Sequence, residues 1–267
     1  MPDGIWLPLL VRMVATGLVV VTATVVAERA GPMLGALLAS LPVAAGPGYV
    51  FLAFEASPDF IAASALMSLL ANAAIPPFLL VFTRLASRTN AWAALAGALA
   101  AWFGAVLLMR LFEWSTAGVV AANVVSYAAC GALIRVPPVG NIVGAPRRWY
   151  ELPLRAVLVG LVVGGSVSMA NALGPAITGI GVVLPVAFSS LAVMLHLRLG
   201  GAVAAATIGR ALTPMIGFAA AILVVRLGAV PVGVWPALGL ALLTSLLWSA
   251  ALLAWHRRGQ PKVRRLR

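Results

Sequence analysis

Long apolar runs interrupted by few charges constrain this chain more than any other feature. Of its 267 residues, 63% are hydrophobic and 9% are charged, whereas a soluble domain carries roughly 25% charged residues. One core cannot hide so many apolar side chains, and a membrane-crossing helix needs about 20 consecutive apolar residues. The sequence therefore predicts an all-α, polytopic transmembrane helix bundle.

The apolar runs between charges and turn residues define nine predicted spans. They cover residues 5–27, 32–54, 59–83, 91–110, 117–134, 153–172, 175–197, 200–225 and 233–255. The second and seventh runs contain proline, and a re-entrant segment in either one would add a tenth element.

Basic residues outnumber acidic ones by 18 to 6, which gives a net charge of +12. In a soluble protein this excess would suggest nucleic-acid binding. Here the arginines lie between apolar runs and in the tail 257–267, as the positive-inside rule requires. Sorting the loops by arginine content predicts an N-terminus outside and a C-terminus in the cytoplasm, and no nucleic-acid partner.

The first half of the chain resembles the second half at an offset of 143 residues. In this frame, without a gap, Arg12 falls on Arg155, Gly31-Pro32 on Gly174-Pro175, and residues 41–44 (LPVA) on 184–187 (LPVA). The offset contains five predicted spans, so the second copy enters the membrane from the opposite face. The pattern predicts an inverted-topology repeat, as in many secondary transporters.

This repeat divides the chain into four predicted parts. Residues 1–116 form the first repeat with spans 1–4, and 117–151 hold the linking fifth span and a cytoplasmic loop. Residues 152–256 form the inverted second repeat with spans 6–9, and 257–267 form the basic cytoplasmic tail.

Two prolines at equivalent positions predict broken helices in spans 2 and 7. Pro42 and Pro185 each fall within a span, where proline removes one backbone hydrogen bond and clashes with the preceding turn. The freed carbonyls must face protein or a water-lined cavity. A simple kink packed against a neighbouring helix is the alternative interpretation.

The first repeat resembles the GlpM family of small bacterial inner-membrane proteins. The resemblance rests on GALLASLP at 35–42, AAIPPFLLVFTRL at 73–85 and AALAGALAAWFGAVLLM at 93–109. It implies that an ancestor one repeat long was duplicated and fused, and that the chain belongs in the bacterial inner membrane. No functional residues carry over from the family.

A charged residue within a predicted span marks a candidate substrate contact. Arg210 lies about ten residues into the eighth span, where an arginine costs roughly 2.5–3.5 kcal/mol to insert. Because arginine grips carboxylates and phosphates bidentately, Arg210 is predicted to bind an anionic solute. Two alternatives stay open: carbonyls freed at Pro214 or Pro185 satisfy Arg210, or its side chain reaches the cytoplasmic interface.

Uncharged polar residues near the predicted breaks complete the candidate substrate site. Asn72 lies in span 3, the counterpart of span 8, so it is predicted to face Arg210 across the repeat interface. Ser189, Ser190 and Thr213 lie just after Pro185 and Arg210. For Asn72, the alternative is a hydrogen bond between helices that serves packing alone.

Arg12 and Arg155 are predicted to flank the two mouths of a pathway. Inverted symmetry puts them at similar depths from opposite faces, where they would attract anions. Anchoring by side chains that extend to the interface is the alternative.

The residues that most enzymes need are missing from suitable positions. No carboxylate lies in the middle of a predicted span, His196 and His256 are far apart, and the only lysine is Lys262. Paired-acid, metal and Ser–Lys catalysis therefore lack their groups, and no glycine-rich loop offers a nucleotide site. We expect no enzyme, no cofactor and no metal.

The sequence thus predicts a secondary transporter or exporter of a small anionic or polar solute. Handling of a lipid or polyprenyl phosphate in envelope assembly is the alternative, as is a non-transporting membrane subunit. Membrane lipids are expected partners, and the sequence is compatible with a homodimer. Substrate identity, coupling ion and transport direction stay open.

Overall fold

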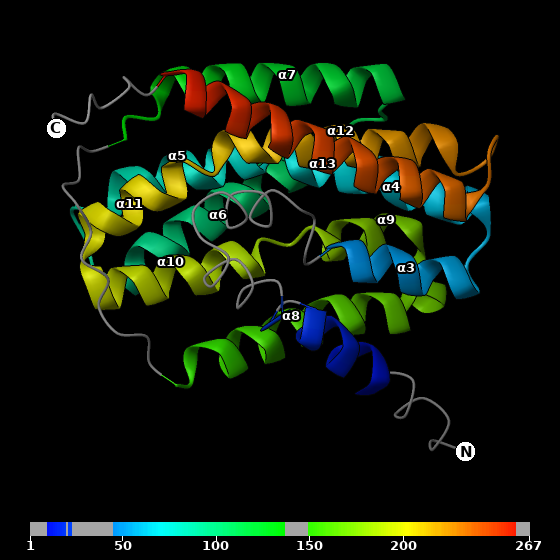
Figure 1. Ribbon diagram of the computed structural model, residues 1–267, viewed down its shortest axis with the longest axis horizontal. Coiled ribbons are helices and arrows are strands. Elements are labelled where there is room, and N and C mark those ends of the chain that lie inside the picture. Colours follow the sequence, from blue (N-terminus) through cyan, green and yellow to red (C-terminus); the bar gives the residue numbers. More distant parts are fainter. Residues whose placement is uncertain (1–9, 20, 23–44, 137–148, 260–267) are drawn as a thin grey trace, which may run out of the picture.

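The computed structural model describes residues 10–19, 21–22, 45–136 and 149–259, with side chains described to residue 255. In this part the chain is all-α, and its helices run side by side as one bundle (Figure 1). In chain order they are Leu10–Val19, α3 Ala45–Glu55, α4 Pro58–Ala73, α5 Ile75–Leu85, α6 Ala91–Met109, α7 Thr116–Leu133, α8 Glu151–Ser168, α9 Ala170–Val182, α10 Val186–Leu199, α11 Gly201–Gly209, α12 Leu212–Gly228 and α13 Val234–Gly259.

Seven described helical segments are long and apolar enough to cross a membrane. They are Pro58–Leu85, Ala91–Met109, Thr116–Leu133, Glu151–Ser168, Ala170–Leu199, Gly201–Gly228 and Val234–Trp255. These segments confirm predicted spans 3–9, and the chain is a multi-pass membrane protein by its helix composition. Spans 1 and 2 are described only in part, by Leu10–Val19 and α3, because residues 23–44 lie outside the described chain.

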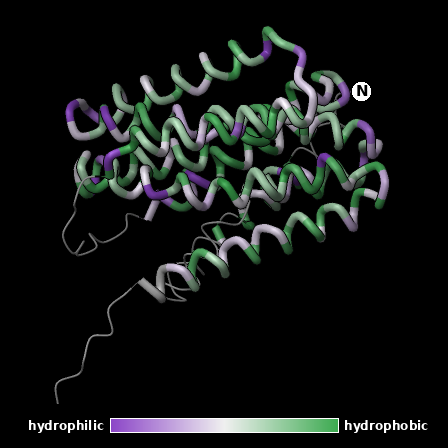
Figure 2. Tube along the Cα trace, turned by 90° about the horizontal axis from the view of Figure 1, so that it is seen from above, coloured by the Kyte–Doolittle hydropathy of each residue, from purple (hydrophilic) through white to green (hydrophobic). Residues whose placement is uncertain are grey.

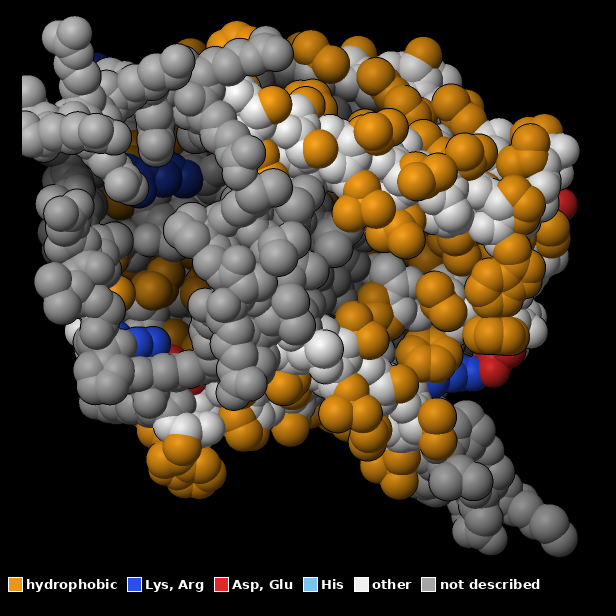
Figure 3. All heavy atoms as spheres, viewed as in Figure 1, with side chains coloured by type: hydrophobic (Ala, Val, Ile, Leu, Met, Phe, Trp, Pro, Cys, Tyr) orange, Lys and Arg blue, Asp and Glu red, His pale blue; other side chains and the backbone are white. Residues whose placement is uncertain are grey.

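The surface of the bundle has the chemistry expected of helices in lipid. Large apolar side chains such as Leu107, Val125 and Leu247 are exposed, and hydrophobic atoms cover much of the described face in Figure 3. Along the trace, hydrophilic residues gather mostly near the helix ends (Figure 2). With lipid as the solvent, outward apolar side chains carry no penalty.

Three of the long segments are broken within their length. The predicted break at Pro185 is confirmed, since α9 ends at Val182 and α10 begins at Val186. Pro42, the other predicted break, lies outside the described residues. Two further breaks separate α4 from α5 at Ala74 and α11 from α12 at Arg210.

The two further breaks follow from prolines in the next turn. Proline lacks the N–H that would bond to the carbonyl four residues earlier, and its ring crowds that carbonyl. Pro77 therefore leaves Ala73 without its helical partner, and Pro214 does the same to Arg210. The breaks fall at these residues.

Helix α4 lies at the centre of the bundle. It packs against α9, α12 and α7. In an 18-residue stretch of Pro58–Leu85, 72% of the residues are buried, the largest share among the seven segments. Small residues such as Ala62, Ala65 and Ser68 line its buried surface. Small side chains let helix backbones approach closely, which drives association within lipid.

Helix α4 approaches α9 closely at Gly179. A Cβ atom on Gly179 would overlap the backbone oxygen of Ser64. Gly179→Ala should therefore destabilise the protein by about 1–3 kcal/mol, the range for overpacking a tight core. The measurement is unfolding of the purified protein in detergent.

Gly104→Ala is the matched control, because nothing lies within 4 Å of the Cβ position at Gly104 in α6. Equal stability of the two variants would show that α4 and α9 do not pack as described.

Candidate functional site

Most of the described charges lie at one of the two ends of the bundle, and Arg210 lies part-way along the Gly201–Gly228 segment. We call the end that holds Arg84, Arg88, Arg135, Glu151 and Arg198 the basic end; it lies on the left in Figure 1. The other end, which we call the opposite end, holds Glu55, Asp59, Arg110, Glu113 and Arg226. A hydrogen bond from Arg226 to Thr116 joins the end of α12 to the start of α7 there.

A buried polar network lies between these ends, on one face of α4. Ser64, Ser68 and Asn72 follow one another at four-residue spacing, so they share that face, and none of the three is exposed. The network continues into α7 through Asn123 and Tyr127. Three helical turns of α4 therefore carry polar groups inside an otherwise apolar bundle.

Asn72 links α4 to α7. Its Nδ2 donates to Asn123 Oδ1 at 3.0 Å and to the Tyr127 hydroxyl at 2.9 Å. Asn123 Nδ2 in turn donates to the Leu69 carbonyl at 2.9 Å. The Oδ1 atom of Asn72 is buried and has no hydrogen-bond partner among the described residues. This acceptor is free for a donor that enters the bundle.

The carbonyl freed by the α4–α5 break belongs to the same network. Ser126 of α7 donates to the Ala73 carbonyl at 2.6 Å, which replaces the bond that Pro77 cannot make. Ser126 of α7 thus satisfies the carbonyl that the break releases.

A second branch joins α4 to α3 and α9. The Tyr49 hydroxyl donates to Ser68 Oγ at 2.7 Å, and Ser68 Oγ donates to the Gly179 carbonyl at 2.7 Å. Four helices therefore meet at the network: α3, α4, α7 and α9.

Sequence reasoning singled out Asn72 and missed most of these partners. The four-residue spacing of Ser64, Ser68 and Asn72 was the signal that could have revealed the shared face. In α7, Asn123, Ser126 and Tyr127 follow the same helical periodicity.

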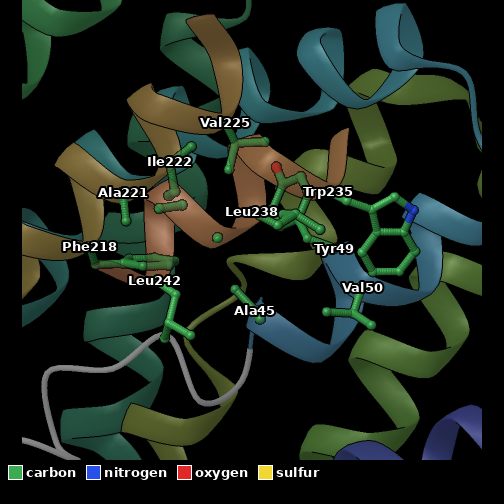
Figure 4. A pocket seen from close by; sticks show the side chains of 13 residues that line it. Ala45, Tyr49, Val50, Phe218, Ala221, Ile222, Val225, Trp235, Leu238 and Leu242 are labelled. Atoms are coloured by element: carbon green, nitrogen blue, oxygen red, sulfur yellow. The ribbon is translucent and has the colours of Figure 1, made fainter. Parts of the chain in front are cut away.

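A cavity of about 380 Å³ adjoins the network between α3, α12 and α13. Its walls are mostly apolar side chains, among them Phe218, Ile222 and Trp235, with Tyr49 on the α3 side (Figure 4). Small-molecule sites have volumes of roughly 300–1,000 Å³. Because the Tyr49 hydroxyl is bonded to Ser68, the cavity and the polar network share this side chain.

The predicted contact Arg210 lies at the junction of α11 and α12 and is exposed. The structure does not pair it with Asn72, whose amide nitrogen donates to Asn123 and Tyr127. Thr213, in the first turn of α12, is also exposed, and its carbonyl accepts from Trp248 Nε1 at 3.1 Å.

The two predicted serines bond within their own helix. Ser189 Oγ donates to the Pro185 carbonyl at 2.7 Å and Ser190 Oγ to the Ala187 carbonyl at 3.1 Å. Both hydroxyl protons are therefore used within the first turns of α10, and the hydroxyl oxygens keep acceptor capacity.

Arg12 is buried near the opposite end, where it forms an ion pair with Glu55 at the end of α3. It also donates to Ser168 Oγ at 3.2 Å. At the basic end Arg198 of α10 pairs with Glu151 of α8, with 2.8 Å between Nη1 and Oε2. Arg155 is half-buried in the second turn of α8.

The network offers hydrogen bonds but no charge. Within the described residues no group of three or more His, Cys, Asp or Glu side chains lies together. The arrangement offers neutral hydrogen-bonding groups inside the bundle. Arg210 lies part-way along a span, and the other described arginines lie at or near the ends of the bundle.

No family model, curated protein or solved structure matches this chain. The site must therefore be interpreted from its own geometry.

The Asn72–Asn123 contact should couple the stabilities of α4 and α7. In a double-mutant cycle of Asn72→Ala and Asn123→Ala we expect a coupling free energy of about 0.6 kcal/mol, the mean for hydrogen bonds between membrane helices, whose maximum is about 1.7 kcal/mol. The measurement is the unfolding free energy of the four proteins in mixed detergent micelles.

Thr207→Val combined with Asn123→Ala is the control, because Thr207 donates only to Val203 within α11. That pair should be additive. Additivity in the Asn72–Asn123 cycle itself would remove this contact from the account.

Proposed function

We propose that this protein is a secondary transporter or exporter of a small anionic or polar solute. It works by alternating access between two inverted repeats, spans 1–4 and spans 6–9. The solute binds where the broken helices and the buried polar network meet, and the two ends open in turn.

The positions of the helix ends carry this proposal. Helix α4 begins at Pro58 and α11 at Gly201, α5 ends at Leu85 and α12 at Gly228, and α6 begins at Ala91 and α13 at Val234. Each pair differs by 143 residues, the offset of the sequence repeat. Similar apolar composition alone gives no reason for three helix ends to recur at one offset.

A reciprocal contact between spans 1 and 6 gives independent support. A Cβ atom on Gly160 would lie 2.7 Å from the Met13 carbonyl oxygen, and one on Gly17 would lie 3.4 Å from the Ala156 Cβ. In the 143-residue frame Met13 matches Ala156 and Gly17 matches Gly160. Contacts that exchange in this way are typical of an interface on a two-fold axis.

The contacts between other helices also come in pairs that the 143-residue offset relates. Helix α5 packs against α6 and α12 against α13, while α10 packs against α6 and α3 against α13. The contact of α4 with α12 has its counterpart in that of α11 with α5. These pairings favour two halves of similar internal structure.

The two ion pairs suit gates at opposite ends. Glu55 and Arg198 occupy equivalent positions in the repeat, and each ties the end of its helix to a neighbouring helix. Arg12–Glu55 joins spans 1 and 2 at one end, and Glu151–Arg198 joins spans 6 and 7 at the other. Breaking one pair while the other holds would open one end only.

The orientation and membrane follow from the charges and from the GlpM resemblance. The basic end faces the cytoplasm under the positive-inside rule, and the membrane is the bacterial inner membrane. We infer that Arg210 meets an anionic group on its way to Asn72, whose free Oδ1 accepts a hydrogen bond from the solute.

Lipid handling is the second candidate, and the cavity beside Tyr49 favours it. Its walls are mostly apolar, and Val50, Trp235 and Leu242 at its rim are exposed. An acyl or prenyl chain would fit such walls better than a small anion does.

A thermal-stability screen distinguishes the two candidates. Wild type, Arg210→Met and Asn72→Leu are measured with organic acids, sugar acids, phosphates and anionic lipids. A ligand at 100 times its Kd stabilises a protein by about 2.7 kcal/mol. We expect a small solute that stabilises wild type, loses its effect in both variants, and is transported in proteoliposomes.

Arg110→Gln is the control, because it removes an exposed arginine from the opposite end. Stabilisation by lipids alone would favour the second candidate if it persists in the variant Arg84→Gln/Arg88→Gln/Arg135→Gln. No stabilisation by any compound, with no transport, would contradict both.

A further inference from the structure

The basic end carries a separate cavity of about 640 Å³ between the ends of α5 and α7. Three arginines line it: Arg84 in the last turn of α5, Arg88 after that helix, and Arg135 just after α7. Thr83 and Ser87 add two hydroxyls.

No carboxylate in the described part of the chain neutralises the positive charge in this cavity. All three arginines are exposed, and none forms an ion pair with a described carboxylate. Glu151, the described acid of this end, pairs with Arg198 instead. The carboxyl ends of α5 and α7 contribute roughly −0.5 charge each, so about two positive charges remain.

The remaining lining is apolar. Ala132, Leu133 and Val136 line the same cavity, and Leu133 is exposed on α7. The side chains of Val124 and Val125 are exposed on the same helix. The cavity therefore combines guanidinium groups at the bundle end with an apolar surface that continues towards its middle.

We propose that this cavity binds a phosphate-bearing anion. Guanidinium groups form bidentate hydrogen bonds with phosphate oxygens, and the hydroxyl of Ser87 supplies a further donor. The apolar side makes the headgroup of an anionic phospholipid the expected source. Basic pockets between membrane helices recognise such headgroups. The site stands whether or not the protein transports a solute.

The test uses the purified full-length chain and the variant Arg84→Gln/Arg88→Gln/Arg135→Gln. The thermal stability of both proteins is measured in titrations with phosphatidylglycerol, with phosphatidylcholine and with inorganic phosphate. Chloride at equal ionic strength is the reference for the phosphate titration. We expect phosphatidylglycerol to stabilise wild type at concentrations where phosphatidylcholine does not. The apparent Kd for phosphatidylglycerol should rise at least tenfold in the variant.

Two further proteins separate binding from folding and from general charge. Arg110→Gln removes an exposed arginine from the opposite end and should bind as wild type does. Arg84→Lys/Arg88→Lys/Arg135→Lys keeps the charge without the bidentate geometry and should bind with intermediate affinity. Because the arginines are exposed, each variant should unfold at the wild-type temperature without ligand.

Stabilisation by phosphatidylglycerol alone, lost with the arginines, assigns the site to a phospholipid. Stabilisation by inorganic phosphate, lost in the same variant, assigns it to a free phosphate anion. Equal effects of phosphatidylglycerol and phosphatidylcholine, or binding unchanged by the glutamine substitutions, would overturn the proposal. None of these outcomes depends on Asn72 or Arg210.

Discussion

A carbonyl released by a helix break inside a bilayer has no water to bond with, and much of this structure follows from that constraint. Pro77 leaves the Ala73 carbonyl without a helical donor, and Ser126 of α7 supplies the replacement. The α4–α5 break therefore requires α7 to lie against α4. Asn123 strengthens the same contact through the Leu69 carbonyl.

The same interaction explains why polar residues gather at the centre of an apolar bundle. Asn72, Asn123 and Tyr127 satisfy one another only when α4 and α7 are in register. Ser68 extends the network to α9, where Gly179 allows the backbones to approach. Once these groups are paired, Oδ1 of Asn72 is left as a buried acceptor without a partner among the described residues.

The sequence predicted spans 3–9 and the break at Pro185, because long apolar runs and proline chemistry are local signals. It did not predict that Arg12 pairs with Glu55, since each lies near a different predicted span and only the fold brings them together. The partners of Asn72 were missed for the same reason. Hydropathy identifies a span but not the direction each residue faces, and Arg210 was accordingly expected beside Asn72.

We propose that the two ends of the bundle open in turn, and distances between spin labels test this alternation most directly. In a Cys130→Ala background, one label pair occupies Val11 and Phe54, and the equivalent pair occupies Leu154 and Leu197. All four positions are exposed, and each residue of one pair lies 143 positions from its counterpart in the other. Glu55→Gln releases the ion pair beside the first label pair.

With this substitution we predict a longer Val11–Phe54 distance and an unchanged or shorter Leu154–Leu197 distance. Glu151→Gln should produce the reverse. If both distances lengthen together, or neither responds to either substitution, the two ends do not alternate and the account is wrong.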